Sequence, residues 1–444
     1  MTRIHRVDSD QLRPHVTHLR HGPASLDRAL ETIGDASLVL LGEATHGSHE
    51  FYDLRAQLTR RLLEEKGFDA VAVEADWPDA YRVNRYVRGQ GDDGSAREAL
   101  AGFQRFPQWM WRNTVVVGFI EWLAAFNEPR EVADRVGFYG LDLYSLYRSA
   151  EAVIQYLDRV DPEAGRRARA RYGCFDHSLG NPQEYGYQAG LGLREDCSDE
   201  AVEQLIELEQ GATEYLRRDG LVAADEQFFA EQNAQVVANA EAYYRAMFTG
   251  RSNTWNLRDR HMSTTLTELR RHLREQGRAG RIVVWEHNSH IGDARATSMG
   301  ARGELNVGQL VREAAGGDAM LIGFTTYDGT VAAASDWDAP VELKSVRPAI
   351  QGSIEHLFHE LGGDLFLPTG AAEVGELLSR PLYERAIGVI YRPQTEMASH
   401  YFQARVAEQF DGVFHIDRTQ ALQPLDLTPA WEPDRVPETY PFGT

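Results

Sequence analysis

The hydrophobic pattern of this chain is a series of short, almost wholly apolar runs, each followed by polar residues. These runs cover residues 37–41, 70–76, 136–142, 281–285, 320–326, 386–391 and 413–416. Runs of this length and composition are typical of strands that are buried on both faces, as in parallel sheets. Between them, apolar residues recur at spacings of three and four, which predicts amphipathic helices. We therefore predict an α/β fold with a mostly parallel sheet flanked by helices.

One long region interrupts this alternation of strands and helices. Residues 148–276 contain no strand-like run and are predicted to form long helices. We expect them to be a large helical insertion between the third and fourth core strands, while residues 1–147 and 277–444 form the α/β catalytic core. Within the insertion, residues 172–198 are rich in Gly, Asn and Tyr and lack helical periodicity, which predicts a long loop.

Composition and charge exclude several classes of partner. Of the 444 residues, 43% are hydrophobic, as in ordinary globular proteins, and the formal net charge is −21. Nucleic acids and anionic membranes both favour basic surfaces, so we expect neither as a main partner. No uncharged apolar run approaches the ~20 residues that span a bilayer, and the first residues lack a signal-peptide core, so we expect a cytoplasmic protein. Cys174 and Cys197 are too few for a disulfide scaffold; whether they pair, and the oligomeric state, are left open by the sequence.

The turn after the first apolar run carries an unusual set of polar side chains. Gly42 ends the predicted strand, and Glu43, Thr45, His46 and His49 follow before the next helical pattern begins. Ligand sites in open α/β sheets lie at the carboxyl ends of strands, where turn residues project into the crevice. A carboxylate, a hydroxyl and two imidazoles in such a turn indicate an active site more than a structural polar turn.

Other predicted strands also end in carboxylates or imidazoles. If the strands are parallel, one edge of the sheet brings together Glu43, His46, Glu74, Asp142, His287 and His290. Carboxylates around an imidazole stabilise its charged form and fix its tautomer through the hydrogen bond it donates. A general base that activates water is usually built in this way. The structural alternative is that Glu74 and Asp142 only cap the helices that follow them.

Arg55 lies on the otherwise apolar face of the helix that follows the first turn, between Phe51 and Leu58. A buried guanidinium needs a carboxylate or an anionic ligand as its partner. We therefore include Arg55 among the candidate site residues. The alternative is a purely structural ion pair with Glu43 or Glu74.

Several common catalytic motifs are absent from the sequence. It contains no G-x-S-x-G, no P-loop, no G-x-G-x-x-G after a strand and no H-E-x-x-H. The pairs His46/His49 and His287/His290 have H-x-x-H spacing and could hold zinc together with nearby carboxylates. A metal-dependent hydrolase is therefore one alternative, and a non-catalytic binder of haem or another apolar ligand is a second. Our main expectation is a site without a metal or cofactor.

Three motifs together resemble the erythromycin esterase family. They are Gly42-Glu-Ala-Thr-His-Gly47, Glu74-Ala-Asp-Trp and Glu286-His-Asn-Ser-His290. Further similar stretches are Phe106-Pro-Gln-Trp-Met-Trp-Arg-Asn113, Asn256-Leu-Arg-Asp-Arg-His-Met262, Tyr391-Arg-Pro-Gln-Thr-Glu396 and Ser399-His-Tyr-Phe402. The likeness extends over about residues 20–420, and its motifs occur in the same order.

The resemblance implies hydrolysis of an ester, in the named members a macrolide lactone, without an obligatory metal. It implies that His46 is the base that activates water and that Glu43 and Glu74 orient the base or the water. It also implies that His287 and His290 are further site residues, while Arg55 matches a family arginine less securely. The expected partner is a small ester or lactone, with inactivation of an antibiotic as one biological role.

Aromatic residues are concentrated between positions 77 and 127, and the segment 103–111 is richest in them. Such a segment could form the wall of a cleft for a large, mostly apolar ligand. As candidate substrate-binding residues we take Trp77, Phe106, Trp109, Trp111 and Asp142. The alternative for the aromatic residues is packing in the core.

Overall fold

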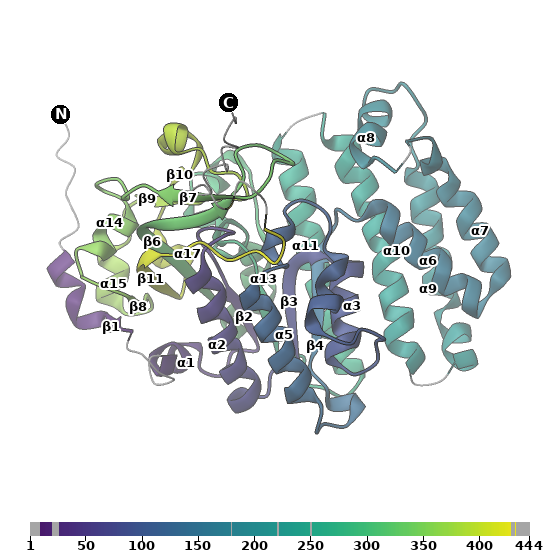
Figure 1. The fold of residues 1–444 in the computed structure, drawn as a ribbon, viewed down its shortest axis with the longest axis horizontal. Coiled ribbons are helices and arrows are strands. Elements are labelled where there is room, and N and C mark those ends of the chain that lie inside the picture. The colour runs from purple at the N-terminus through teal and green to yellow at the C-terminus, as the bar shows by residue number, and fades with distance from the viewer. Residues whose placement is uncertain are drawn as a thin grey trace, which may run out of the picture.

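The computed structural model of the protein describes residues 9–19, 26–178, 180–219, 222–248, 251–427 and 431. The two ends of the predicted core, residues 1–8 and 432–444, lie outside the described residues. At the centre of the described chain is a nine-stranded sheet with helices on both faces (Figure 1). Its strands are β1 (Thr17–His18), β2 (Leu38–Leu41), β3 (Ala70–Asp76), β4 (Gly137–Asp142), β5 (Ile282–Trp285), β6 (Ala319–Ala333), β7 (Glu342–Val346), β8 (Leu365–Pro368) and β11 (Gly412–Thr419).

The strand order is β1-β8-β11-β6-β2-β5-β3-β4, with β7 paired to β6. Neighbours from β11 through β4 pair in parallel, and the pairs β1–β8, β8–β11 and β6–β7 are antiparallel. The prediction of a mostly parallel sheet is therefore confirmed. In β2, Leu41 lies opposite both Trp285 of β5 and Ile322 of β6, so that the strand is covered on both edges.

The helices form the two outer layers and a block beside the sheet. They are α1 (Asp27–Ile33), α2 (His49–Lys66), α3 (Trp77–Val87), α4 (Ala96–Ala99), α5 (Thr114–Asn127), α6 (Leu146–Val160), α7 (Pro162–Tyr172), α8 (Pro182–Gly190), α9 (Ser198–Asp219), α10 (Val222–Ala246), α11 (Arg251–Glu275), α12 (Asn288–Ile291), α13 (Val307–Ala315), α14 (Ile354–His359), α15 (Ala372–Leu377), α16 (Glu396–Ser399) and α17 (Val406–Gln409). Helices α2 and α5 pack on one face of the sheet, and α11 and α13 pack on the other.

One predicted strand is wrong. Residues 386–391 form only isolated bridges, at Ile387 and Ile390, and the strand nearby is β9 (Leu382–Arg385). It pairs with β10 (Tyr401–Ala404) in a separate two-stranded sheet. The run is apolar because Ile387 and Tyr391 are buried against β6, and not because the chain forms a ladder there.

The chain between β4 and β5 consists of helices α6–α11 with short connections. Helices α6–α10 lie to one side of the sheet, on the right in Figure 1, and have a hydrophobic cluster of their own. Met262 and Leu266 of α11 belong instead to the cluster that covers the sheet, as do Phe228 and Val236 of α10. The predicted division into a core and an insertion at 148–276 stays a prediction.

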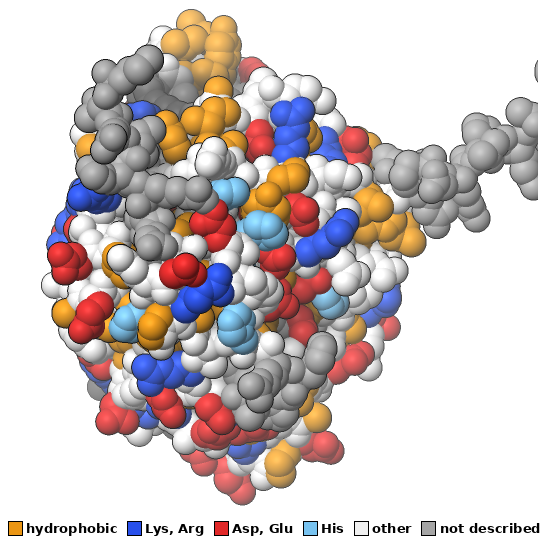
Figure 2. All heavy atoms as spheres, turned by 90° about the vertical axis from the view of Figure 1, so that its left-hand side faces the viewer, with side chains coloured by type: hydrophobic (Ala, Val, Ile, Leu, Met, Phe, Trp, Pro, Cys, Tyr) orange, Lys and Arg blue, Asp and Glu red, His pale blue; other side chains and the backbone are white. Residues whose placement is uncertain are grey.

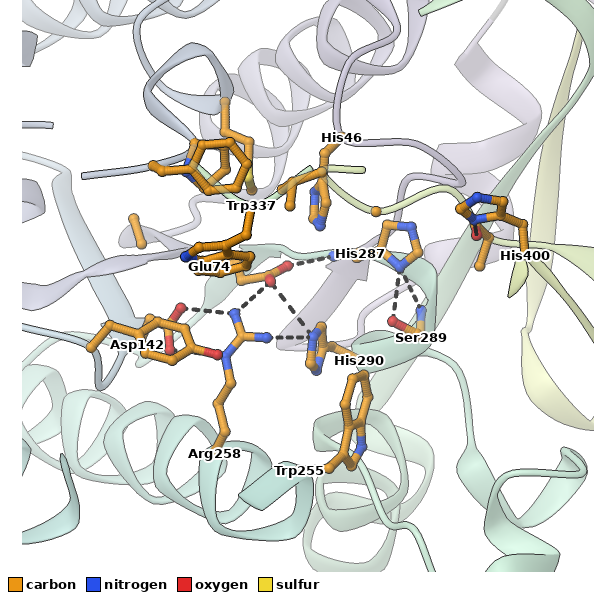
Figure 3. A pocket seen from close by; sticks show the side chains of 18 of the residues that line it. His46, Glu74, Asp142, Trp255, Arg258, His287, Ser289, His290, Trp337 and His400 are labelled. Carbon is orange, nitrogen blue, oxygen red and sulfur yellow. Dashed lines mark hydrogen bonds and ion pairs between the residues drawn. The ribbon is translucent and has the colours of Figure 1, made fainter. Parts of the chain in front are cut away.

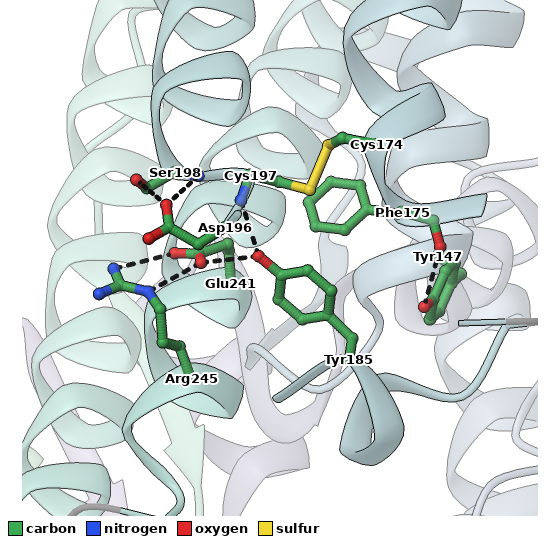
Figure 4. Close-up of a disulfide and its surroundings, with 9 residues drawn as sticks. All are labelled: Tyr147, Cys174, Phe175, Tyr185, Asp196, Cys197, Ser198, Glu241 and Arg245. Carbon is green, nitrogen blue, oxygen red and sulfur yellow. Dashed lines mark hydrogen bonds and ion pairs between the residues drawn. A yellow bond between two sulfur atoms is a disulfide. The ribbon is translucent and has the colours of Figure 1, made fainter. Parts of the chain in front are cut away.

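A disulfide joins Cys174 to Cys197 within this helical block (Figure 4). The hydroxyl of Tyr185, on α8, donates a hydrogen bond to Glu241 and accepts one from the backbone N–H of Cys197, each at 2.8 Å. The predicted long loop at 172–198 is therefore wrong in part, because α8 lies inside it. The pairing that the sequence left open is present.

The side of the molecule drawn in Figure 2 carries charges of both signs and some hydrophobic side chains. Figure 2 shows acidic, basic and histidine side chains interspersed over one side of the molecule. None of the described helices combines the length and the apolar character that crossing a bilayer would require.

Candidate active site

The carboxyl ends of β2, β3, β4 and β5 open onto a cavity of about 570 Å³. Parallel strands place their carboxyl ends at one edge of the sheet, which is why turns far apart in the sequence meet here. Its charged and imidazole lining includes His46, Glu74, Asp142, Arg258, His287 and His290 (Figure 3). Its aromatic lining includes Phe103, Phe106, Trp111, Tyr144, Trp255 and Trp337. A volume of this size suits a small-molecule ligand.

His46 lies in the turn between β2 and α2 and is the cavity-facing end of a buried chain of polar groups. Its Nδ1 is 2.8 Å from Oε1 of Glu43, whose Oε2 accepts a hydrogen bond of 2.8 Å from Nη2 of Arg55. Because a carboxylate oxygen only accepts, Nδ1 of His46 carries a proton, and in the neutral form of the ring Nε2 has the lone pair. The Arg55 guanidinium lies over the rings of Tyr52 and Trp285. Glu43 and Arg55 therefore lie behind His46 and do not line the cavity.

Two glycines allow this turn to fit against its neighbours. A Cβ added to Gly47 would lie 1.9 Å from the carbonyl oxygen of Ala332 in β6. One added to Gly42 would lie 2.1 Å from Oδ1 of Asn288. The close approach of the turn to β6 and α12 therefore requires glycine at both positions.

Glu74, at the end of β3, is held by hydrogen bonds to both of its oxygens. Oε1 accepts from Nη2 of Arg258 at 2.6 Å, and Oε2 accepts from the backbone N–H of His287 at 2.9 Å. Burial alone would raise the pKa of Glu74, but His290, Arg258 and His46 outweigh it and hold that pKa well below its usual range. The side chain is therefore a carboxylate at neutral pH.

Asp142, at the end of β4, faces the same guanidinium. Its oxygens accept from Nε of Arg258 at 3.0 Å and from Nη2 at 2.8 Å. Burial raises the pKa of Asp142, and the guanidinium of Arg258 more than compensates, so that the pKa is lowered. Asp142 thus lines the cavity, as predicted for a substrate-binding residue, but its carboxylate is engaged by Arg258.

His287 has the opposite tautomer from His46. It caps the N-terminus of α12, and its Nδ1 accepts the backbone N–H of Ser289 at 3.2 Å. The proton is therefore on Nε2, which is a buried atom. Burial and the neighbouring His46, whose ring centroid is 4.7 Å away, hold the pKa of His287 well below its usual value. A backbone hydrogen bond with Ala44 acts in the other direction but is outweighed, so the imidazole is neutral.

Both ring nitrogens of His290 are occupied. Nδ1 is 2.9 Å from Oδ1 of Asp259, and Nε2 is 3.0 Å from Nη1 of Arg258. Burial lowers the pKa of His290, but the carboxylates of Asp259 and Glu74 outweigh it and raise that pKa. Sequence reasoning gave no role to Arg258 or Asp259. The available signal was their position inside the stretch 256–262, one of the stretches that carry the family resemblance.

The predicted aromatic residues divide into two groups. Phe106 and Trp111 line the cavity. Trp109 packs against Phe106 but does not line the cavity. Trp77 is buried against α10, where its Nε1 donates to the carbonyl of Phe229. The alternative of core packing therefore describes Trp77 and Trp109 better. Trp255, Trp337 and Tyr144 line the cavity and were not predicted.

The geometry gives no support to the metal-dependent alternative. Within the ranges that the structure describes, His, Cys, Asp and Glu side chains form no group of three or more that could hold a metal ion. His49 begins α2 and does not line the cavity, so the first H-x-x-H pair does not converge there.

Comparisons with known proteins show the family to which the chain is related. The sequence model of the family described as "Erythromycin esterase" matches residues 63–419. Erythromycin esterase type II of Escherichia coli is 24% identical over 410 residues, which cover 87% of this chain and 90% of that protein.

Two solved structures share the fold. One is a Bacillus cereus protein with a TM-score of 0.78 and 18% identity, covering 94% of this chain and 98% of the other. The other is a mutant of the erythromycin esterase EreC in its open conformation, with a TM-score of 0.67 and 16% identity over 95% and 99% of the two chains.

Proposed function

Because the chain belongs to the erythromycin esterase family, we propose that it is a hydrolase that cleaves an ester or lactone by attack of an activated water. The name of the Escherichia coli relative makes a macrolide lactone the first substrate to test. Within this proposal we include a cytoplasmic location and a role in antibiotic resistance. No observation favours the haem-binding or metal-dependent alternatives.

The observation that carries the proposal is the pair formed by His46 and Glu43 at the edge of the cavity. With its proton on Nδ1, His46 has the lone pair of Nε2 available to take a proton from water. The carboxylate of Glu43 then stabilises the imidazolium and keeps the ring in place. Arg55 in turn holds Glu43, which explains a guanidinium buried far from solvent.

The tetrahedral intermediate of ester hydrolysis needs a hydrogen-bond donor for its oxyanion. Of the predicted side chains, Arg55 lies behind Glu43 and both nitrogens of His290 are occupied. His287 remains: it lines the cavity, and its Nε2 carries the proton of the neutral ring. We assign to it the stabilisation of the oxyanion. The carboxylate of Glu74 can orient the attacking water.

The remaining lining suits the apolar parts of a large ester. Phe106 and Trp337 contact each other with ring centroids 4.9 Å apart, and Trp111 and Trp255 of α11 also line the cavity. In this proposal the predicted insertion at 148–276 supplies one wall of the substrate cavity through α11. Aromatic rings around a few fixed polar groups are typical of small-molecule sites.

The test is mass spectrometry of a panel of macrolides and simple esters after incubation with the protein in ¹⁸O-labelled water. Hydrolysis adds one water (~20 Da with the heavy isotope) to the substrate and places the label in the new carboxyl group, as activation of water requires. The reaction is repeated with a chelator, which should leave the rate unchanged. A panel in which every compound is unchanged would contradict the proposed activity.

A further inference from the structure

One turn of α11 surrounds His290 on three sides. The indole of Trp255 stacks on the imidazole, with ring centroids 4.5 Å apart and planes 7° from parallel. Arg258 donates to Nε2 at 3.0 Å, and Asp259 accepts from Nδ1 at 2.9 Å. Residues three and four positions apart share one face of a helix, so these three side chains are presented together. Figure 3 shows Trp255 and Arg258 of this group.

Arg258 connects this turn to the ends of two strands. Its guanidinium donates to Glu74 of β3 and, through a fork, to Asp142 of β4. The same group lies over the ring of Tyr144, 5.0 Å from the centroid. One side chain of α11 thus fixes the relative positions of two carboxylates and an imidazole.

Asp259 is itself fixed. Its side chain is fully buried, and Oδ1 also accepts the backbone N–H of Val307, at the start of α13. A carboxylate held between two helices cannot follow His290 if the ring turns. It therefore selects one ring orientation and one tautomer, with the proton on Nδ1.

We propose that the turn Trp255–Asp259 of α11 is a positioning element for the catalytic centre, in which Asp259 and Arg258 set the orientation and tautomer of His290 and Arg258 orients Glu74. These residues act through Glu74 and His290 and not on the reacting atoms. The proposal rests on the proposed function only where it concerns turnover, since the positions and titration of the two groups can be measured without substrate.

The pH behaviour of the two groups depends on all the charges that face them. Glu74 is faced by His46, Tyr52, Asp142, Arg258, Glu286, His287 and His290. His290 is faced by Glu74, Arg258, Asp259 and His287. Removing the charge of Asp259 should lower the pKa of His290, because that carboxylate stabilises the imidazolium. Removing the charge of Arg258 should raise the pKa of Glu74, because burial disfavours the carboxylate and one of the cations that stabilise it is then missing.

The first test is ¹⁵N NMR of histidine-labelled full-length protein, with the His290 signals assigned from His290→Asn. In the wild type, Nε2 of neutral His290 should show the shift of an unprotonated nitrogen. Asp259→Asn should lower the pKa of His290 by about one to three pH units. The matched control is Asp225→Asn. It breaks the pair between Asp225 of α10 and His272, which lies on α11 like Asp259 but away from the cavity. A His290 titration equal in wild type, Asp259→Asn and Asp225→Asn would overturn the proposal.

The second test is ¹³C NMR of the Glu74 carboxyl group, assigned from Glu74→Gln. Arg258→Met should raise the pKa of Glu74, and Arg258→Lys, which keeps the charge without the fork, should raise it less. Arg88→Met is the control, because Arg88 forms a similarly buried pair with Asp225 outside the cavity. A Glu74 titration that is unchanged in Arg258→Met would contradict the proposal. If Arg258→Met does not fold, the titration of Glu74 in Arg258→Lys and the titration of His290 in Asp259→Asn test the proposal in its place.

Turnover supplies the third readout. With a substrate found in the mass spectrometry panel, kcat/KM of Arg258→Met at neutral pH should fall about 10²-fold, as for misplaced catalytic groups. The acid limb of its pH profile should move to higher pH, together with the pKa of Glu74. A merely structural loss would lower the rate without moving the limb, and would overturn the positioning role. Loss of the proposed function would instead appear as no turnover in the wild type, with the NMR results unaffected.

Discussion

The ring centroids of His46 and His287 are 4.7 Å apart, yet the protons of the two neutral rings are on different nitrogens. The acceptor beside His46 is the carboxylate of Glu43, while the donor beside His287 is the backbone N–H of Ser289. One ring is therefore left with a lone pair and the other with an N–H. At the scale of single residues, the first hydrogen bond that each ring makes sets this difference, on which the proposed roles of a base and an oxyanion donor depend.

His46→Asn should abolish the base without changing the size of the side chain much. We expect kcat/KM to fall by about 10²–10⁴-fold or more, with the fold intact by circular dichroism. The control is His49→Asn, because His49 belongs to the same turn but does not line the cavity. Equal activity of the two variants would show that His46 is not the base.

Glu384 is a buried acid that makes the stability depend on pH. Burial and the nearby Glu355 raise its pKa from 4.5 to about 8. The folded protein then keeps a proton that the unfolded chain has lost, so stability is complete below pH 4.5 and falls as the pH rises to 8. The slope is about 1.4 kcal/mol per pH unit. Glu384→Gln should remove this slope in denaturant titrations between pH 5 and 8, whereas an unchanged slope would mean that Glu384 is ionised when folded.

At the scale of elements, the turn between β2 and α2 is shaped by its contact with β6. The sequence pattern predicted its strand and helix correctly, because a buried strand and an amphipathic helix have different periods. It did not predict the contact of Gly47 with Ala332, because that contact depends on a strand almost 300 residues away. The run at 386–391 was mistaken for a strand for the same reason: its apolar residues pack against other elements.

Gly47→Ala should push the turn away from β6, because its Cβ would lie 1.9 Å from a backbone oxygen. We expect a loss of unfolding free energy of about 1–3 kcal/mol and a fall in activity, since His46 is adjacent. Gly118→Ala is the control: nothing lies within 4 Å of a Cβ there, and in α5 it should gain about 0.5–1 kcal/mol. Urea unfolding of both variants measures the two effects, and a Gly47→Ala variant as stable as the wild type would contradict the contact.

At the scale of the whole molecule, the site is assembled from two parts of the chain. The sheet supplies His46, Glu74, Asp142 and His287, and α11 supplies Arg258. Helix α11 also packs on the sheet through Met262 and Leu266, which fixes it relative to the strand ends. The disulfide lies elsewhere, within α6–α10, and so bears on the stability of that block.

Cys174→Ser should therefore lower stability while leaving the catalytic centre in place. The two cysteines are 23 positions apart in the sequence. Loss of the bridge should lower the free energy of unfolding by about 2–4 kcal/mol. We expect faster hydrogen exchange in α7–α9, with kcat/KM changed less than twofold. Wild-type protein treated with a reductant is the control. Faster exchange in β2–β5, or lost activity, would show instead that the bridge supports the site.

The sequence by itself determined the six parallel strands of the sheet, most of the helices and the polar turns at the strand ends, because burial and periodicity are written into neighbouring residues, but it did not reveal β1, β7 or β8. It also contained the family motifs, and with them His46, Glu43, Glu74, His287 and His290. Only the tertiary structure decided that Arg258 and Asp259 meet His290, that Trp77 and Trp109 lie outside the cavity, and which nitrogen of each imidazole is protonated. These features depend on hydrogen bonds and packing between residues distant in the chain, and no local pattern encodes such partners.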